Sequence, residues 1–269
     1  MHYHALIILE NFHSNSFAAD TEEKANAVLH RVISAPAVFE DQTEEAKAAY
    51  KRHIGKKTKA IPSLEKFATE IMGFDHDAST NRFGTFYYSR FHWTDYWKWG
   101  GRFPNSILVR KDCQEFLPLE LPFVGVDMPL CPEGYQWVAA ARKKDIQWAK
   151  MHELRVELAT RDHNMIQKVF NGADVMETLG AGWFLEGDSI FFLNSLIGQR
   201  GDTLAEHLQK VGLSDPESVI GFSDILTEDD SFSSTSPEYK DMEEWGEQLT
   251  DIVMDAFPDD ILVSVDCHY

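Results

Sequence analysis

Cysteine and long apolar runs are both scarce in this chain of 269 residues. The three cysteines, Cys113, Cys131 and Cys267, are odd in number and show no paired spacing typical of a metal site. Thiols left free in this way are typical of a reducing compartment. No apolar run approaches the ~18 residues that a membrane span requires, and the first residues lack the pattern of a signal peptide. We therefore expect a cytoplasmic protein that does not bind membranes.

Basic residues are also few, with 25 Lys and Arg against 44 Asp and Glu and a net charge of −19. From Leu213 to Tyr269 there are 16 acidic residues and one basic residue, Lys240. Direct binding to nucleic acid is disfavoured, because phosphate neutralisation requires clustered Lys and Arg. Such a region can simply keep the protein soluble, or it can bind a basic surface on another protein.

The motifs of common catalytic classes are missing. There is no phosphate-binding loop of the Walker type, no Gly-x-Ser-x-Gly and no His-Glu-x-x-His. The GAGW sequence at 180–183 lacks the third glycine of a dinucleotide-binding loop. The sequence therefore carries no recognisable catalytic signature and predicts no cofactor, although the histidines described below leave a divalent metal open.

The apolar pattern predicts an α+β fold with strands at 2–10 and 260–269. Helices are indicated at 20–33, 144–158, 202–212 and 236–258, and a hairpin at 180–196. We expect a single domain over 1–269 with a mixed or antiparallel sheet and helices on one face. As in a ferredoxin-like arrangement, the first and last strands would lie adjacent. Residues 112–134 contain four prolines and read as an irregular insertion.

The most unusual segment is YYSRFHWTDYWKWGGRF at 87–103, which we interpret as a long connection between two strands. Its aromatic faces could stack on a base, its glycine amides could bind an anion, and its arginine could bind a phosphate. Together they predict a pocket of nucleotide size, formed by Tyr88, Trp93, Asp95, Trp97, Trp99, Gly100, Gly101 and Arg102.

Two alternatives weaken this pocket. Asp95 could pair with Arg102 inside the protein and neutralise its charge. The aromatic side chains could instead form a small core that fixes a long loop, with Gly100 and Gly101 serving the turn.

The terminal strands offer a second candidate site. Ser264, Asp266 and His268 share one face of the last strand, and His2 and His4 share one face of the first. If the strands pair antiparallel, His2 or His4 can approach Asp266 and His268. Such a cluster could bind a transition metal, for which we name His4, Asp266 and His268, or act as acid and base. If the strands pair in parallel, these side chains lie at opposite ends of the sheet, exposed to water, and form no site.

Several landmarks resemble those of a family of mostly uncharacterised phage-encoded proteins. They are Gly100-Gly101-Arg102 in its aromatic segment, KKDI at 143–146, GWF at 182–184 and Val265-Asp266-Cys267-His268. The family pattern before the glycines is Trp-Asp-Trp-Tyr, whereas this chain has Thr94, Asp95, Tyr96 and Trp97, so that only the aspartate matches. The resemblance implies a phage accessory protein of the host cytoplasm that blocks a host defence.

Two functions follow from these observations. The first is a non-enzymatic accessory protein that binds a host protein or sequesters a nucleotide-like ligand, either alone or as a homo-oligomer. The acidic C-terminal third and the missing catalytic signature favour it. The alternative is a metal- or His/Asp-assisted hydrolase that acts on a nucleotide, which Arg102 and the terminal histidines favour.

Overall fold

The computed structural model describes residues 2–55, 61–120, 131–193, 195–216, 221–233 and 242–268. It divides into two compact units, and each has a core of its own. Residues 1–28 and 95–269 form what we call the sheet unit, and residues 29–94 form the small unit. The predicted α+β class is confirmed. Among the described residues, no helix is both long enough and apolar enough to span a bilayer.

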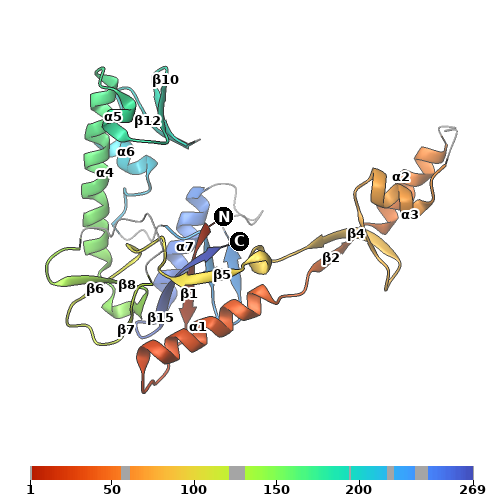
Figure 1. Ribbon diagram of the computed structural model, residues 1–269, viewed down its shortest axis with the longest axis horizontal. Coiled ribbons are helices and arrows are strands. Elements are labelled where there is room, and N and C mark those ends of the chain that lie inside the picture. The colour runs from red at the N-terminus through yellow and green to blue at the C-terminus, as the bar shows by residue number, and fades with distance from the viewer. Residues whose placement is uncertain are drawn as a thin grey trace. The chain divides into compact units, whose positions relative to one another are not determined.

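The sheet unit is built around the two terminal strands, β1 (His2–Leu9) and β15 (Ile261–His268). They pair antiparallel, from His2 opposite His268 to Leu9 opposite Ile261. The two ends of the chain therefore lie together, as Figure 1 shows and as the sequence predicts. The strand order is β14-β13-β1-β15-β9-β7, and the strands added to β1 and β15 are β13 (Asp224–Leu226), β14 (Ser231–Ser233), β9 (Ala140–Arg142) and β7 (Phe116–Leu117).

A further strand, β5 (Tyr96–Trp99), pairs antiparallel with β15 and places Trp99 opposite Val265. This strand lies within the aromatic segment, which the sequence analysis treats as a connection. That interpretation is wrong for residues 96–99. Between a short 3-10 helix, η2 (Arg90–Trp93), and the glycine turn, the strand has only four residues, three of them aromatic and one a lysine, which are too few to show a clear alternation.

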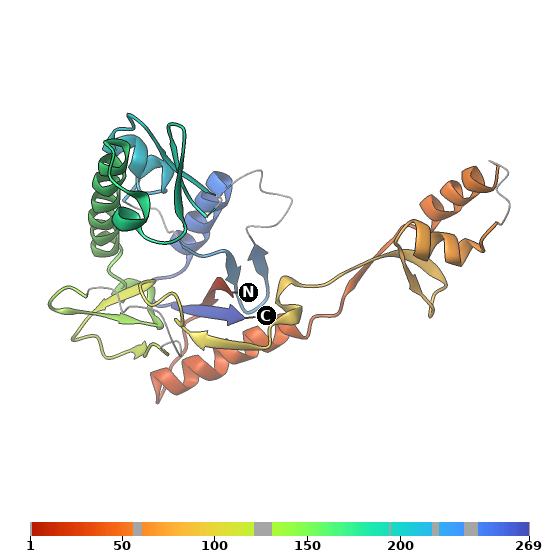
Figure 2. The ribbon, with the colours of Figure 1, turned by 45° about the horizontal axis from the view of Figure 1, so that its top comes forward.

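Helices cover both faces of the terminal strands, and not one face as predicted. On one face, Leu6 belongs to the same core cluster as Trp245 of α7 (Met242–Asp255). On the other face lie Cys267 and, opposite it, Trp97, whose indole N–H donates to Asn26 of α1 (Phe17–Ile33) at 3.0 Å. Figures 1 and 2 both show the sheet between these two helices. Both faces of β1 and β15 are buried, so each requires a cover.

Beside the sheet, β6 (Ile107–Arg110) and β8 (Tyr135–Val138) form an antiparallel pair. A 3-10 turn, η3 (Lys143–Asp145), then follows β9. The predicted irregular insertion at 112–134 is partly regular, because Phe116–Leu117 pairs with β9 as strand β7. Residues 121–130 of it lie outside the described residues.

The rest of the sheet unit is mainly helical. Helix α4 (Trp148–Phe170) extends well beyond the predicted 144–158 and is followed by α5 (Val175–Leu179). The predicted hairpin is present as β10 (Trp183–Glu186) and β11 (Ser189–Phe192), to which β12 (Ser195–Gln199) adds a third strand. Helix α6 (Leu204–Lys210), within the predicted 202–212, begins with a capping box of Thr203 and Glu206.

The small unit contains a three-stranded sheet of β2 (Val38–Asp41), β4 (Arg82–Tyr87) and β3 (Asp75–Asp77). Its helices are α2 (Thr43–Ile54) and α3 (Leu64–Lys66), the latter continued by a π-helical turn, η1 (Phe67–Ile71). Ala46, Ala68 and Phe83 form its buried core. The side chain of Ser63 caps α3 by accepting a hydrogen bond from the N–H of Lys66.

Candidate functional site

The predicted aromatic clamp is divided between the two units. Tyr88 and Trp93 lie in the small unit, where their rings are 5.8 Å apart and Trp93 is 64% exposed. Trp97 and Trp99 lie in β5 of the sheet unit, where Trp99 is buried and Trp97 is bonded to α1. Within the sheet unit these two tryptophans are therefore parts of the packing and do not form an open stacking platform.

The Gly-Gly-Arg turn does bind an anion, but the anion is a carboxylate of the protein itself. Gly100 and Gly101 both have positive φ, at +74° and +48°. The turn directs the main-chain N–H of Arg102 to Oδ2 of Asp266, at 3.0 Å. A Cβ at Gly101 would lie 2.5 Å from the same oxygen, which explains the need for glycine there. The amides that we expected to bind a ligand thus hold the last strand.

The register of β1 and β15 brings the candidate residues of both termini onto one face. We call this set, consisting of His2, His4, Ser264, Asp266 and His268, the polar row. Its two ends differ. The open end contains His2, Asp266 and His268, and the closed end contains His4 and Ser264.

At the open end two imidazoles are each held by a carboxylate. Nδ1 of His2 lies 2.8 Å from Oδ1 of Asp266, and Nδ1 of His268 lies 2.8 Å from Oδ1 of Asp95. The bond from His268 lowers the pKa of the Asp95 carboxyl below its usual value. The two imidazole rings are 4.7 Å apart, and Tyr96 stacks on His268 at 4.5 Å. Asp95 therefore pairs with His268 and not with Arg102, as the alternative had suggested.

These hydrogen bonds fix the orientation of both rings. Because a carboxylate only accepts, Nδ1 of each histidine must carry the proton. The second nitrogen, Nε2, of His2 and of His268 has no hydrogen-bond partner among the described residues. Both imidazoles are partly exposed, at 19% for His2 and 28% for His268. Each ring thus keeps a basic nitrogen that no described residue binds, in a side chain that solvent reaches in part.

At the closed end His4 is fully enclosed. Its ring stacks on Phe103 with centroids 4.0 Å apart and lies 4.1 Å from the ring of Phe222. Nδ1 donates to the carbonyl of Gly221, and Nε2 accepts from the hydroxyl of Ser264 at 2.8 Å. Burial lowers the pKa of His4 to about 3, so the ring is neutral at physiological pH.

The metal set proposed from the sequence is not assembled as one cluster. Both ring nitrogens of His4 are used in hydrogen bonds, whereas Asp266 and His268 pair with His2 and Asp95 respectively. Among the described residues, no group of three or more His, Cys, Asp or Glu is arranged to hold a metal ion. The histidine that approaches Asp266 is His2, the other of the two that the antiparallel register allows. Cys267 lies on the opposite face and is fully buried, as expected.

The open end can transfer protons. An imidazole held at Nδ1 by a carboxylate acts as a base through Nε2 and, once protonated, as an acid. Two such rings side by side can perform both roles in one reaction. Carboxylate-held imidazoles also serve as metal ligands, because the carboxylate orients the ring and increases its basicity. Asp95 is the member that sequence spacing alone could not assign, since its partner lies 173 residues away.

Comparison with protein-family models, with curated proteins and with solved structures finds no match to this chain.

Proposed function

We propose that the protein is a hydrolase that acts on a nucleotide, with His2 and His268 as its acid–base pair. The observation that carries the proposal is the pair of adjacent, carboxylate-held imidazoles whose Nε2 atoms have no described partner. Such pairs of groups are typical of sites that both remove and deliver a proton. The sequence gives this function as an alternative, and the geometry of the open end favours it over simple binding.

In the proposed reaction a water molecule attacks the phosphorus of a phosphate ester. The neutral imidazole of the pair takes a proton from the water as the new P–O bond forms. The ester P–O bond breaks, and the protonated imidazole gives its proton to the leaving oxygen. Asp95 and Asp266 hold the rings and stabilise the imidazolium form in which each passes through the cycle.

A nucleotide is the substrate class that the surrounding residues suit. The side chain of Arg102 is exposed and belongs to the residue whose N–H binds Asp266, so it brings a permanent positive charge to this end of the row. Tyr96 is 42% exposed and stacked on His268, and its outer ring face is a surface for a base. A phosphate and a planar group are the two parts that a nucleotide combines.

The test is a hydrolysis assay with bis(p-nitrophenyl) phosphate, p-nitrophenyl phosphate and a panel of nucleoside phosphates and cyclic nucleotides. We expect His2→Gln and His268→Gln each to reduce kcat by about 100-fold or more, because general acid–base catalysis typically contributes that much. Arg102→Ala should mainly raise KM. His13→Gln, at an exposed histidine of the same unit, is the matched control and should retain full activity. Full activity in His268→Gln would contradict the proposal, as would no turnover of any compound.

A chelator separates the two versions of this chemistry. If the imidazoles transfer protons directly, EDTA should leave the rate unchanged. If they bind a divalent metal through Nε2, EDTA should abolish activity, added Zn²⁺ or Mn²⁺ should restore it, and both histidine variants should lose metal together with activity.

Helix α7 supports a second proposal, that the protein binds a host protein with a basic surface and so antagonises it. Glu247, Asp251 and Asp255 are exposed and spaced four residues apart, which places them in one stripe along the helix. Such a stripe can steer and orient a basic partner. Replacing all three residues by Lys should abolish capture of that partner and leave the melting temperature nearly unchanged. Retained capture would contradict the role of this stripe.

A further inference from the structure

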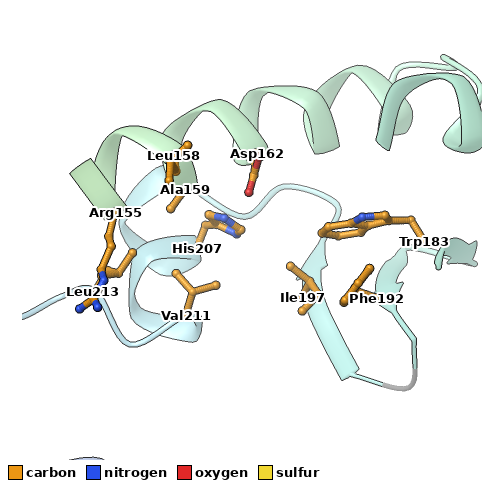
Figure 3. A pocket seen from close by; sticks show the side chains of 10 residues that line it. All are labelled: Arg155, Leu158, Ala159, Asp162, Trp183, Phe192, Ile197, His207, Val211 and Leu213. Carbon is orange, nitrogen blue, oxygen red and sulfur yellow. The ribbon is translucent and has the colours of Figure 1, made fainter. Parts of the chain in front are cut away.

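The helical part of the sheet unit contains a cavity of about 340 Å³ that the proposed reaction does not use. It lies between α4, α6 and the strands β10, β11 and β12, and Figure 3 shows the side chains that line it. The volume is at the lower end of the range of pockets for small molecules. Its lining is mostly apolar, with Trp183, Phe192 and Ile197 at one end and Val211 and Leu213 toward the other.

Arg155 of α4 is the unusual member of this lining. Its side chain is partly buried, and desolvation lowers the pKa of its guanidinium to about 10. Among the residues that the structure describes, none forms an ion pair or a hydrogen bond with it. A desolvated charge without a partner is unfavourable, and proteins normally pair such a group. The arrangement is therefore suited to an anion from outside the chain.

The other polar groups of the cavity do not provide that anion. Asp162 lies at the rim, where its side chain is 41% exposed and 4.0 Å from Arg161. His207 is buried, and burial lowers the pKa of its imidazole, so the ring is neutral at physiological pH. Within the described lining, Arg155 is thus the group that carries a positive charge.

We propose that this cavity binds a small amphipathic anion, whose carboxylate or sulfonate pairs with Arg155. Its apolar body lies against Trp183, Phe192 and Ile197, where contact with the rings and the aliphatic side chain removes apolar surface from water. The anion supplies a charge partner that none of the described residues provides for Arg155. No member of the polar row lines this cavity, and the site does not depend on the proposed hydrolysis.

Fluorescence titration with two probes tests the proposal. The probes are 1-anilinonaphthalene-8-sulfonate and its uncharged counterpart N-phenyl-1-naphthylamine, which share an aromatic body and differ in the sulfonate. We expect the wild-type protein to bind the sulfonate at one site per chain and more tightly than the neutral probe. Arg155→Gln should lower the affinity for the sulfonate probe by about tenfold or more and leave the affinity for the neutral probe unchanged. Arg161→Gln, on the same helix but exposed, should alter neither.

Several results would overturn the proposal. One is an affinity of Arg155→Gln for the sulfonate probe equal to that of the wild type. Another is a loss of affinity in Arg161→Gln as large as that in Arg155→Gln. The third is the absence of saturable binding of the sulfonate probe to the wild-type protein. Because Arg155→Gln could disturb folding, competition on the wild-type protein gives an independent measurement. Decanoate should displace the sulfonate, whereas decanol at the same concentration should not, and equal displacement by both would also overturn it. His268→Gln should bind the probe like the wild type, which separates this site from the proposed active site.

Discussion

The polar row contains two histidines on one strand, two residues apart, that the fold treats in opposite ways. His4 is stacked on Phe103, is bonded through both ring nitrogens and has a pKa of about 3. His2 is bonded through Nδ1 alone and is partly exposed. The residue type, the strand and the face are the same, and the covering segments differ. A histidine in a sequence is therefore a candidate whose chemistry the neighbouring chain decides.

The same contrast separates the two aspartates of the row. Asp266 is buried and accepts bonds from His2 and from the main chain of Arg102. Asp95 is exposed and bonds to His268. The buried carboxylate joins the aromatic segment to the last strand, and the exposed one orients a ring. Asp266 should therefore contribute chiefly to the stability of the fold, and Asp95 chiefly to the geometry of the candidate site.

The largest effect is expected at the strand that carries this segment into the sheet. Trp99 is 3% exposed, so Trp99→Ala should reduce the free energy of unfolding by about 4 kcal/mol, through lost burial and the cavity left behind. Trp93→Ala, at a ring that is 64% exposed, should change it by about 0.5 kcal/mol or less. Urea unfolding monitored by circular dichroism measures both. Similar values for the two variants would contradict a structural role for Trp99.

A slightly smaller effect is expected at the turn that holds Asp266. In Gly101→Ala the new Cβ would lie 2.5 Å from the Asp266 carboxylate on a backbone with φ of +48°. We expect a loss of about 3 kcal/mol, from backbone strain together with displacement of the carboxylate. Gly134→Ala shares the positive φ but has no atom within 4 Å, and should lose only about 1 kcal/mol. Thermal unfolding of the two variants should show this difference, and equal losses would mean that the turn does not hold Asp266.

Because the pKa of His4 at the closed end is low in the folded protein, acid should destabilise the fold. The imidazole titrates at about 3 in the folded protein and near 6.5 when unfolded. Well above pH 6.5 both states are neutral and His4 adds no pH dependence. As the pH falls from 6.5 to 4, His4 binds a proton in the unfolded state but stays neutral in the folded state. The free energy of unfolding therefore decreases by about 3 kcal/mol.

The control for this pH dependence is His4→Gln. The variant should be less stable at neutral pH because buried hydrogen bonds are changed. Its stability should nevertheless fall by about 3 kcal/mol less than that of the wild type between pH 6.5 and 4. Urea unfolding at each pH gives the free energy of unfolding of the two proteins. If the two values fall in parallel with pH, His4 is not held in its neutral form in the folded protein.

The smallest effect on stability is expected at the open end. Asp95 is 62% exposed, so Asp95→Asn should leave the free energy of unfolding nearly unchanged near neutral pH. The low pKa of Asp95 adds stability that is lost as the pH falls below its usual value near 3.8, and the variant should lack this dependence. Nitrogen-15 NMR should show a change in the tautomer of His268 and none in that of His4. An unchanged His268 signal would remove the role assigned to Asp95.

Local pattern predicts much of the fold. Strands β1 and β15 and helices α6 and α7 depend on patterns within a short window, and each lies within the range that the sequence predicts. The start of the predicted last helix, Ser236 and Pro237, lies outside the described residues. The short strand β5 and the separate core of residues 29–94 are not anticipated, because four residues show little pattern and a unit boundary depends on contacts distant in sequence.

The candidate site is predicted in part. The sequence names Asp95, Asp266 and His268, and its antiparallel alternative admits His2. It also assigns Gly100 and Gly101 to an anion without identifying that anion as Asp266. Arg155 and its cavity are missed, because the lining comes from five separate elements and nothing around Arg155 in the sequence marks it. The burial of Arg155 and the absence of a partner for it among the described residues are properties of the folded chain.

The amino-acid sequence by itself determined the α+β class, the strands at the two ends of the chain and the residue types that gather where those strands meet, because alternation and capping act over a few residues. The tertiary structure alone decided which histidine is sealed and which is open, since that depends on Phe103 and Phe222 closing over one ring while no described segment caps the other. Desolvation and hydrogen-bond partners, supplied from distant parts of the chain, set the chemistry of each residue.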